Sequence, residues 1–253
     1  HIGAIAYHLP ELRAPVYGTP LTLGLVRVKL EESGYLPNAD LRPLDPDTDE
    51  RVTAGVFELE PFRVTHSIPD AIGFAINPPA GLLVHTGDFK LDPTPIDDRP
   101  VDFAKLRRFA DQGVRLLISD CVHVESPGAT PSERVVGETY DRLFAETDGR
   151  IVIATFASLI ARIQQIIDVA EKHGRRVAVL GRSLEKNVQM ALELGYLTDP
   201  PHRLVDGREG SFLPDHEIVY VVTGSQGEPM AVLSRIANGD HRDVTIGEGD
   251  TVV

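Results

Sequence analysis

The chain has 253 residues, of which 42% are hydrophobic, and a formal net charge of -13 at pH 7. This length and apolar content suffice for one large domain or two ordinary domains with a substantial core. The acidic balance argues against binding nucleic acid through a general basic surface, because such binding depends on neutralising phosphates. Any nucleic-acid site must be local, and the basic residues of segment 150–182 favour the second half.

The single cysteine, Cys121, excludes an internal disulfide and a thiolate-rich zinc site. It fits a reducing cytosol, so we expect a cytoplasmic protein. The sequence has no run of about 18 apolar residues and no secretory signal at its start, so we expect no membrane partner. Because the chain begins with His1 and ends on apolar Thr251–Val253, we also expect a fragment truncated at both ends.

Up to about Asp120 the pattern is mostly that of β-strands. β-branched and aromatic residues alternate roughly with polar ones, and Asn77-Pro-Pro-Ala-Gly81 is a strong hairpin turn. A meandering sheet is predicted, with strands over residues 51–60, 62–65, 72–76 and 82–85.

An amphipathic helix is predicted over residues 102–112, where Gly113 ends the helical pattern. The apolar segment 114–119 that follows predicts a buried strand, which Asp120 ends.

The second half alternates strands and helices, a pattern typical of a parallel α/β sheet. Thr130-Pro131-Ser132-Glu133 combines an N-cap residue, a first-turn proline and a glutamate, so a helix is predicted from here to about Ala145. Ser225-Gln-Gly-Glu228 has the pattern of a second capping box. The predicted order is strand 151–155, helix 158–173, strand 176–180, helix 183–194, strand 217–223 and a helix opened by 225–228.

Two short segments place a metal-ligand type of side chain at the end of a strand, Thr65-His66-Ser-Ile-Pro-Asp70 and His85-Thr-Gly-Asp88-Phe-Lys90. Zinc or manganese bound for hydrolysis takes neutral imidazoles and carboxylates, and a carboxylate can bridge two metals. His66 and Asp88 are suitable types. Taken alone, the same two residues also fit a buried, hydrogen-bonded histidine and a turn aspartate, and spacing favours this simpler interpretation.

Three strand ends pass directly into predicted helix starts, where unpaired N–H groups and the helix dipole attract anions. They are Phe156-Ala157-Ser158, Gly181-Arg182-Ser183 and Gly224-Ser225-Gln226-Gly227. At the carboxyl ends of parallel strands these segments would form one phosphate-lined surface that holds a nucleic acid by its backbone. Ordinary helix capping by the three serines explains the same residues equally well.

A set of motifs, in a fixed order, runs through nearly the whole chain. Its members are His1-Ile-Gly, Pro15-Val-Tyr-Gly-Thr, Thr65-His-Ser-Ile-Pro-Asp70, His85-Thr-Gly-Asp-Phe-Lys90, Ser119-Asp120, Thr130-Pro-Ser-Glu133, Phe156-Ala-Ser158 and Thr223-Gly-Ser-Gln-Gly-Glu-Pro229. This set resembles the ribonuclease J family, in the β-CASP branch of the metallo-β-lactamase superfamily. The resemblance implies an α/β fold, with a partial metallo-β-lactamase αββα sandwich in residues 1–127 followed by a parallel-sheet α/β β-CASP domain in residues 128–253.

The resemblance also implies a site for two divalent metal ions, with zinc as first choice and manganese as the alternative. His1 matches the last member of the family's His-x-His-x-Asp-His stretch, His66 the next metal-binding histidine, and Asp88 the carboxylate that bridges the ions. Asp120 matches an acid beside the active site, so Asp88 and Asp120 are the catalytic candidates; without the resemblance, Asp120 is more simply a turn cap. The family's later His-x-Ser-Gly-His segment does not occur before Val253, so the fragment itself is expected to be inactive.

In the family, the segments matched by Phe156-Ala157-Ser158 and Gly224-Ser225-Gln226 lie on the β-CASP face that covers the RNA channel. The implied activity is hydrolysis of RNA phosphodiester bonds in RNA maturation and decay, as a 5′-to-3′ exonuclease, an endonuclease or both. The expected partner is single-stranded RNA with a 5′-monophosphate end, and the full-length protein is expected to be a homodimer or homotetramer. Two alternatives stay open: a small-ester or thioester metallo-hydrolase, and a noncatalytic RNA-binding module.

Overall fold

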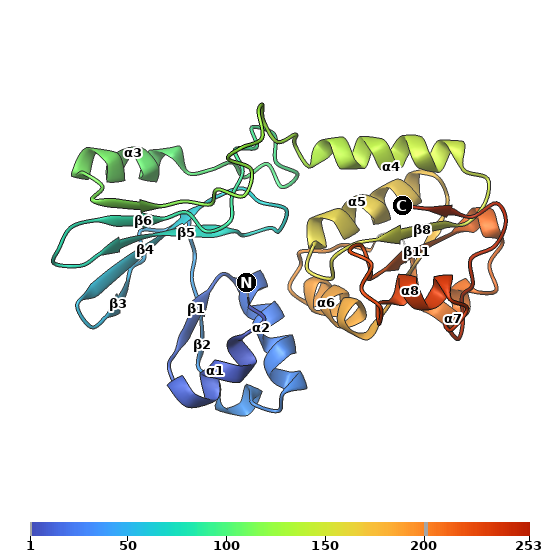
Figure 1. The fold of residues 1–253 in the computed structure, drawn as a ribbon, viewed down its shortest axis with the longest axis horizontal. Coiled ribbons are helices and arrows are strands. Elements are labelled where there is room, and N and C mark those ends of the chain that lie inside the picture. The colour runs from blue at the N-terminus through green and yellow to red at the C-terminus, as the bar shows by residue number, and fades with distance from the viewer. Residues whose placement is uncertain (1, 200–201) are drawn as a thin grey trace. The chain divides into compact units, whose positions relative to one another are not determined.

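The computed structural model describes residues 2–199 and 202–253, and the chain divides into two compact units, His1–Arg134 and Val135–Val253 (Figure 1). Each unit combines helices with a β-sheet, so the α/β class predicted from the sequence is confirmed. Within the described ranges, no helix has both the length and the apolar character needed to cross a membrane.

The first unit begins with helices where the sequence predicted mainly strands. Helix α1 (Ile5–Leu12) and helix α2 (Pro20–Glu32) accompany a short parallel pair, β1 (Val16–Gly18) with β2 (Leu41–Pro43), and a 3-10 turn, η1 (Leu36–Asn38). No helix was predicted for residues 20–32, where Leu21, Leu23 and Leu25 alternate with smaller or polar residues. In the structure these leucines are all buried, on a helix that is covered on most sides and so lacks one apolar stripe.

A five-stranded sheet follows, as the predicted meander requires. Its order is β3-β4-β5-β6-β7, antiparallel from β3 to β6, with β7 parallel to β6. Helix α3 (Phe103–Gln112) packs on the sheet through Phe109, whose ring lies 5.8 Å from that of Phe62. The strands are β3 (Val52–Ala54), β4 (Phe57–Arg63), β5 (Ile72–Asn77), β6 (Leu83–His85) and β7 (Leu116–Ile118).

Strand β7 is exposed, so its predicted burial is wrong. Leu116, Leu117 and Ile118 are 49%, 59% and 41% exposed. The apolar run led to the wrong prediction because residue type reports the tendency to be buried, not the presence of a covering layer. Over the described part of the chain, β7 pairs with β6 alone and forms the edge of the sheet.

The second unit is a five-stranded sheet of order β10-β9-β11-β8-β12 in which every neighbouring pair is parallel. All five residues of the central strand, β11 (Ile218–Val222), are buried, as expected for a strand covered on both faces. The apolar end of the chain forms β12 (Thr251–Val252), which pairs with β8. The remaining strands are β8 (Ile151–Ala154), β9 (Arg176–Leu180) and β10 (Leu204–Val205).

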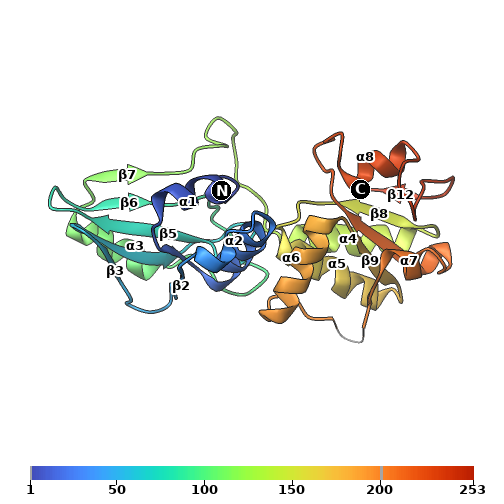
Figure 2. The same ribbon diagram turned by 90° about the horizontal axis from the view of Figure 1, so that it is seen from below.

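Helices cover this sheet on both faces, with α8 on one side of β8 and α4 and α5 on the other (Figure 2). Ile163 and Ile167 of α5 belong to the apolar face that the sequence predicted, and both are fully buried. The helices of this half are α4 (Arg134–Glu146), α5 (Ile160–Lys172), α6 (Arg182–Glu193), α7 (Gly207–Gly210), the 3-10 turn η2 (Asp215–Glu217) and α8 (Val232–Ala237).

The prediction that a helix begins at Ser225–Glu228 is wrong. These residues form a turn, and α8 begins only at Val232. Gly227 has a φ of +73°, outside the helical region, and the carboxylate of Glu228 accepts a hydrogen bond from Gln226 N at 3.2 Å. The spacing of Ser225 and Glu228 suggested a capping box, but the Glu228 side chain closes a local turn instead.

Candidate active site

Three strands of the first unit end at the same edge of the sheet. Strand β5 is antiparallel to both β4 and β6, and β7 is parallel to β6, so β4, β6 and β7 all run in one direction. His66, Asp88 and Asp120 each follow one of these strands by two to three residues. The topology therefore brings the three predicted site residues of this sheet to one edge.

Backbone contacts fix the turn that carries Asp88. Thr86 N donates to Ile118 O at 3.0 Å, and the Thr86 hydroxyl accepts a hydrogen bond from Asp120 N at 3.1 Å. Gly87 has a φ of +64°, and a Cβ on this residue would lie 2.8 Å from Ile72 O. Only glycine fits this turn without strain, which explains the glycine in the His-Thr-Gly-Asp motif.

The Asp120 carboxylate links the turns that follow β6 and β7. One oxygen accepts a hydrogen bond from Val122 N at 2.9 Å, and the other accepts one from Phe89 N at 3.4 Å. The hydrogen bond from Val122 N is the main cause that lowers the pKa of Asp120, and partial burial opposes it. The hydrogen bond from Phe89 N and the nearby imidazoles of His66 and His123 lower the pKa further. Asp120 is thus a turn cap, as the simpler interpretation held, and it also contacts the Asp88 turn.

The side chains at this edge provide only part of a metal site. His66 and Asp88 are both exposed and are ligand types that zinc and manganese accept. In residues 2–199 and 202–253, no three His, Cys, Asp or Glu residues are grouped so that they could hold a metal ion. His1, the third expected ligand, lies outside the described residues.

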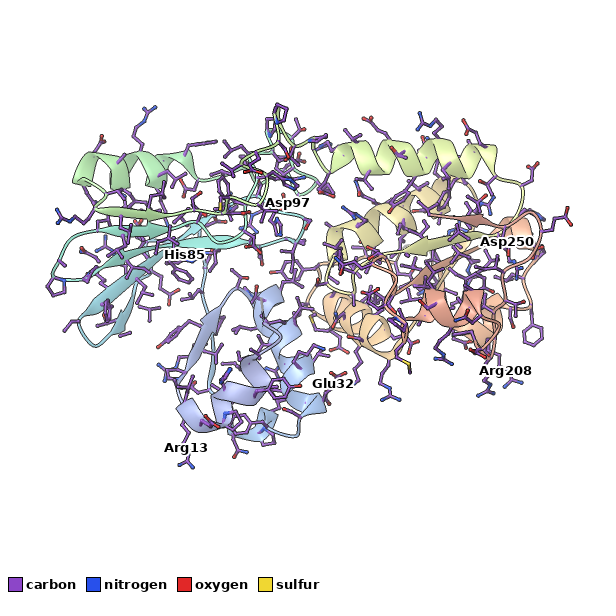
Figure 3. All side chains as sticks on the ribbon, viewed as in Figure 1. Arg13, Glu32, His85, Asp97, Arg208 and Asp250 are labelled. Atoms are coloured by element: carbon purple, nitrogen blue, oxygen red, sulfur yellow. The ribbon has the colours of Figure 1, made fainter. Side chains whose placement is uncertain are left out.

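The two other histidines near this edge have different surroundings. His85, labelled in Figure 3, accepts a hydrogen bond from Gly87 N on its Nδ1 atom at 3.0 Å, which helps to hold the turn. His123 lies in an exposed loop. The metal-type donor set at the sheet edge is therefore one imidazole and one carboxylate, with Asp120 beside them.

In the second unit, the predicted RNA-binding segments follow two adjacent strands, β8 and β11. The chain leaves β8 towards β9 through α5, and leaves β11 in the opposite direction towards β12 through α8. In open parallel sheets, ligands bind in the crevice at such a switch point, outside the carboxyl ends of the strands. Phe156-Ala157-Ser158 and Gly224-Ser225-Gln226 flank this point, where Thr155 N donates to Val222 O at 2.9 Å.

The surfaces of these segments differ in exposure. Phe156 is 44% exposed, and both Ser225 and Gln226 are exposed. Gly224 is buried with a φ of +120°, and a Cβ there would lie 3.0 Å from the Cβ atoms of Ala231 and Leu233. The turn after β8 thus exposes an aromatic ring, and the tightly packed turn after β11 exposes polar side chains.

Two residues near this switch point, Asn187 and Thr155, were not predicted from the sequence. Asn187, buried on α6, donates from Nδ2 to Ala157 O at 2.8 Å and so holds the Phe156 turn from a helix 30 residues further along the chain. Its signal in the sequence is an amide on the apolar face formed by Leu184, Val188 and Ala191. Thr155 is 2% exposed, and its hydroxyl has no hydrogen-bond partner among the described residues.

Helix capping does not account for the three serines of the predicted anion sites. The N-cap residues of α5, α6 and α8 are Leu159, Gly181 and Ala231, and none of these makes a side-chain capping bond. At the third segment, Gly181 N donates to Glu185 Oε1 at 3.0 Å. An acid of the chain already occupies this N–H, which makes the segment after β9 the least suited of the three to an anion.

The comparisons with known proteins agree with the resemblance in the motifs. Residues 148–253 match the family model "Ribonuclease J, beta-CASP domain". Over its whole length the chain is 48% identical to ribonuclease J of Thermus thermophilus and 42% identical to ribonuclease J of Helicobacter pylori. It spans 45% of the first relative and 37% of the second, so it covers less than half the length of either.

A solved structure, of a protein of unknown function from Enterococcus faecalis, matches with a TM-score of 0.58 over 84% of this chain and 54% of its own. At 17% identity this match supports the fold alone. The motifs and the two identities over the full chain carry the assignment. The chain therefore belongs to the ribonuclease J family, and residues 148–253 carry the β-CASP domain of that family.

Proposed function

We propose that the complete protein is a metal-dependent ribonuclease that hydrolyses RNA phosphodiester bonds as a 5′-to-3′ exonuclease, an endonuclease or both. The observation that carries this proposal is that His66, Asp88 and Asp120 follow three strands that end at the same edge of the sheet, in a chain 48% identical to a ribonuclease J. The competing ester or thioester hydrolases lack a β-CASP domain, whereas this chain carries one.

Membership of the ribonuclease J family implies the use of divalent metal. We propose that His1, His66 and Asp88 would contribute ligands for two divalent ions, zinc or manganese. When bound, such ions supply a nucleophile at neutral pH and compensate the charge that develops on the phosphate. Three ligands are too few for two ions, so we propose that residues 1–253 by themselves hydrolyse little RNA.

The protein groups around the metal have separate tasks in this proposal. Asp120, whose pKa is lowered, is ionised at neutral pH and holds Phe89 N, so it fixes the turn from which Asp88 projects. Gly87 lets this turn approach β5 closely. Residues next to ligands that restrict their orientation commonly change metal affinity or activity when they are removed.

We assign RNA binding to the switch point of the second unit. The exposed ring of Phe156 can stack on a base, while Ala157 and Ser158, with Gly224, Ser225 and Gln226, contact the phosphate backbone. Such contacts select single strands without reading their sequence. The preference for a 5′-monophosphate, the homo-oligomeric state and the domain division at 127/128 stay predictions.

The test uses the complete protein with RNA labelled at its 5′ end. Wild type should release labelled products only in the presence of divalent metal, and Asp88→Ala should abolish cleavage while the circular-dichroism spectrum and melting temperature stay close to those of wild type. Asp111→Ala, an exposed acid on α3, is the matched control. Full activity in the Asp88→Ala variant would refute the metal assignment, and hydrolysis of esters or thioesters without RNA cleavage would refute the ribonuclease.

A further inference from the structure

The segment that leads out of the first unit is hydrogen-bonded to another loop of that unit. Residues 121–130 form an exposed loop, but the next residues, Pro131–Arg134, are tied to the loop that follows Asp88. The Ser132 hydroxyl donates to Asp92 Oδ2 at 3.0 Å, and Glu133 N donates to the same oxygen at 3.2 Å. Helix α4, which continues into the second unit, begins at the next residue.

Lys90 makes the second set of contacts with this segment. Its Nζ atom donates to Glu133 Oε1 at 2.9 Å and to Pro131 O at 3.2 Å, and lies 3.7 Å from Asp92 Oδ2. The side chains of Lys90, Asp92 and Glu133 are 12%, 1% and 16% exposed. Water therefore screens these ion pairs much less than it screens surface pairs.

Asp92 is ionised in this position. Burial by itself would raise the pKa of Asp92, but hydrogen bonds from Thr94 N, Ser132 and Glu133 N, together with the charge of Lys90, outweigh it and lower the pKa. A charged, nearly buried carboxylate that accepts several hydrogen bonds has few other arrangements that are equally stable. The contact between the two segments is therefore specific in its geometry.

The same loop is also joined to the residue before His66. Lys90 N donates to Thr65 O at 2.8 Å, Asp92 N donates to the Thr65 hydroxyl at 3.2 Å, and that hydroxyl donates to Lys90 O. Thr65 is 5% exposed. Thr65 is adjacent to His66 and Lys90 is two residues after Asp88, so one cluster connects both proposed metal ligands with the chain that leads into the second unit.

We propose that Thr65, Lys90, Asp92, Ser132 and Glu133, here named the junction cluster, are positioning residues that couple the attachment of the second unit to the loops of His66 and Asp88. The cluster fixes one point of the chain, immediately before α4, relative to these loops. Without the cluster, the start of α4 would be free to move relative to these loops, and so would RNA bound by the second unit. The catalytic consequence rests on the proposed ribonuclease function, whereas the mechanical coupling does not.

The decisive variant weakens the cluster at Ser132 and Glu133, the two residues just before α4. Ser132→Ala combined with Glu133→Gln removes the hydroxyl and the charge but leaves the contacts among Thr65, Lys90 and Asp92 intact. In the complete protein, kcat/KM for RNA should fall by on the order of tenfold to a hundredfold, as expected when a bound substrate is misplaced. Hydrolysis of a small chromogenic phosphodiester, which needs no second unit, and the metal content should stay unchanged. Ser132→Thr combined with Glu133→Asp should restore much of the RNA cleavage.

The matched control is Glu125→Gln combined with Ser126→Ala, the same chemical changes in the exposed loop just upstream. Unchanged RNA cleavage in the Ser132/Glu133 variant would overturn the inference. Equal losses on RNA and on the small phosphodiester would also overturn it, since the cluster would then serve the metal loops alone. A wild-type protein that cleaves neither substrate would refute the proposed function instead.

A distance measurement tests the coupling without any activity. Spin labels at Asp111→Cys on α3 and Lys172→Cys on α5, in a Cys121→Ser background, report on the separation between the two units; both labelled side chains are exposed. The distribution of distances should be broader in the Ser132/Glu133 variant than in the parent. Identical distributions would overturn the inference, whether or not the protein proves to be a nuclease. Melting temperatures confirm that each variant is folded.

Discussion

The Asp120 carboxylate accepts a hydrogen bond from Phe89 N at 3.4 Å, so the acid after β7 contacts the turn that carries Asp88. This contact makes Asp120 more than a cap of its own turn. It links the ends of two parallel strands that both lead to the proposed metal site.

Replacing Asp120 with asparagine should lower RNA cleavage by roughly tenfold to a hundredfold, because an amide cannot accept bonds from both Val122 N and Phe89 N. Steady-state kinetics and metal analysis of the complete protein measure the loss. Asp141→Asn on α4, which removes a half-exposed charge paired with Lys172 and His173, should leave the rate unchanged. Wild-type rates in Asp120→Asn would remove its positioning role.

Replacing Ser225 with glutamate should weaken RNA binding about tenfold, or about 1.4 kcal/mol, while metal binding is unaffected. Ser225 is exposed at the proposed phosphate surface, where an added negative charge repels the RNA backbone. The control is His216→Glu, because His216 precedes β11 and lies at the opposite edge of the sheet. Fluorescence anisotropy with labelled RNA gives both affinities, and equal values for the two variants would contradict the assignment.

Replacing Lys105 with methionine should destabilise the first unit by about 2–4 kcal/mol. The buried Lys105 Nζ donates to the carbonyl oxygens of Pro46, Thr48 and Pro61 at 2.8, 2.6 and 3.0 Å, and the variant leaves all three without this donor. Differential scanning calorimetry should show a lower melting temperature. Lys29→Met, at a more exposed position on α2, serves as the control; equal shifts would show that Lys105 contributes no more than a surface lysine.

The junction cluster should lose stability only in acid. The pKa of Asp92 is lowered in the folded protein, so its stabilising effect is complete above its ordinary pKa near 3.8 and is lost as the pH falls through the lower, folded value. Asp92→Asn should therefore melt below wild type from pH 5 to 7, and the two melting temperatures should begin to converge only as the pH falls below about 4. A difference that grows towards low pH would show that the sign of this linkage is wrong.

Local patterns predicted the second unit well. The strands and helices from Ile151 to Leu194 were predicted within two residues of their observed ends, because glycine stops and helical spacing act locally. The same rules gave wrong predictions where distant parts of the fold decide. Strand β7 has the apolar run of a buried strand, and the turn at Ser225 has the pattern of a helix start.

The residues of the proposed metal site were identified by motif, but their surroundings were not. Contacts such as that of Asn187 with Ala157, or of Lys90 with Glu133, join residues 30 and 43 positions apart. No spacing rule predicts such pairs, because they depend on which loops the sheet order brings together. Gly87 in the Asp88 turn is different, because its positive φ is a local requirement and the glycine in the motif indicates it.

The exposed strand β7 has a practical consequence for work on residues 1–253 alone. An uncovered edge strand with three large apolar side chains can pair with another strand along its backbone, and it also exposes apolar surface. Preparations of this polypeptide should self-associate in a concentration-dependent way through β7, and light scattering should detect the association. Introducing a lysine at Leu117, the most exposed of the three, should keep the polypeptide monodisperse.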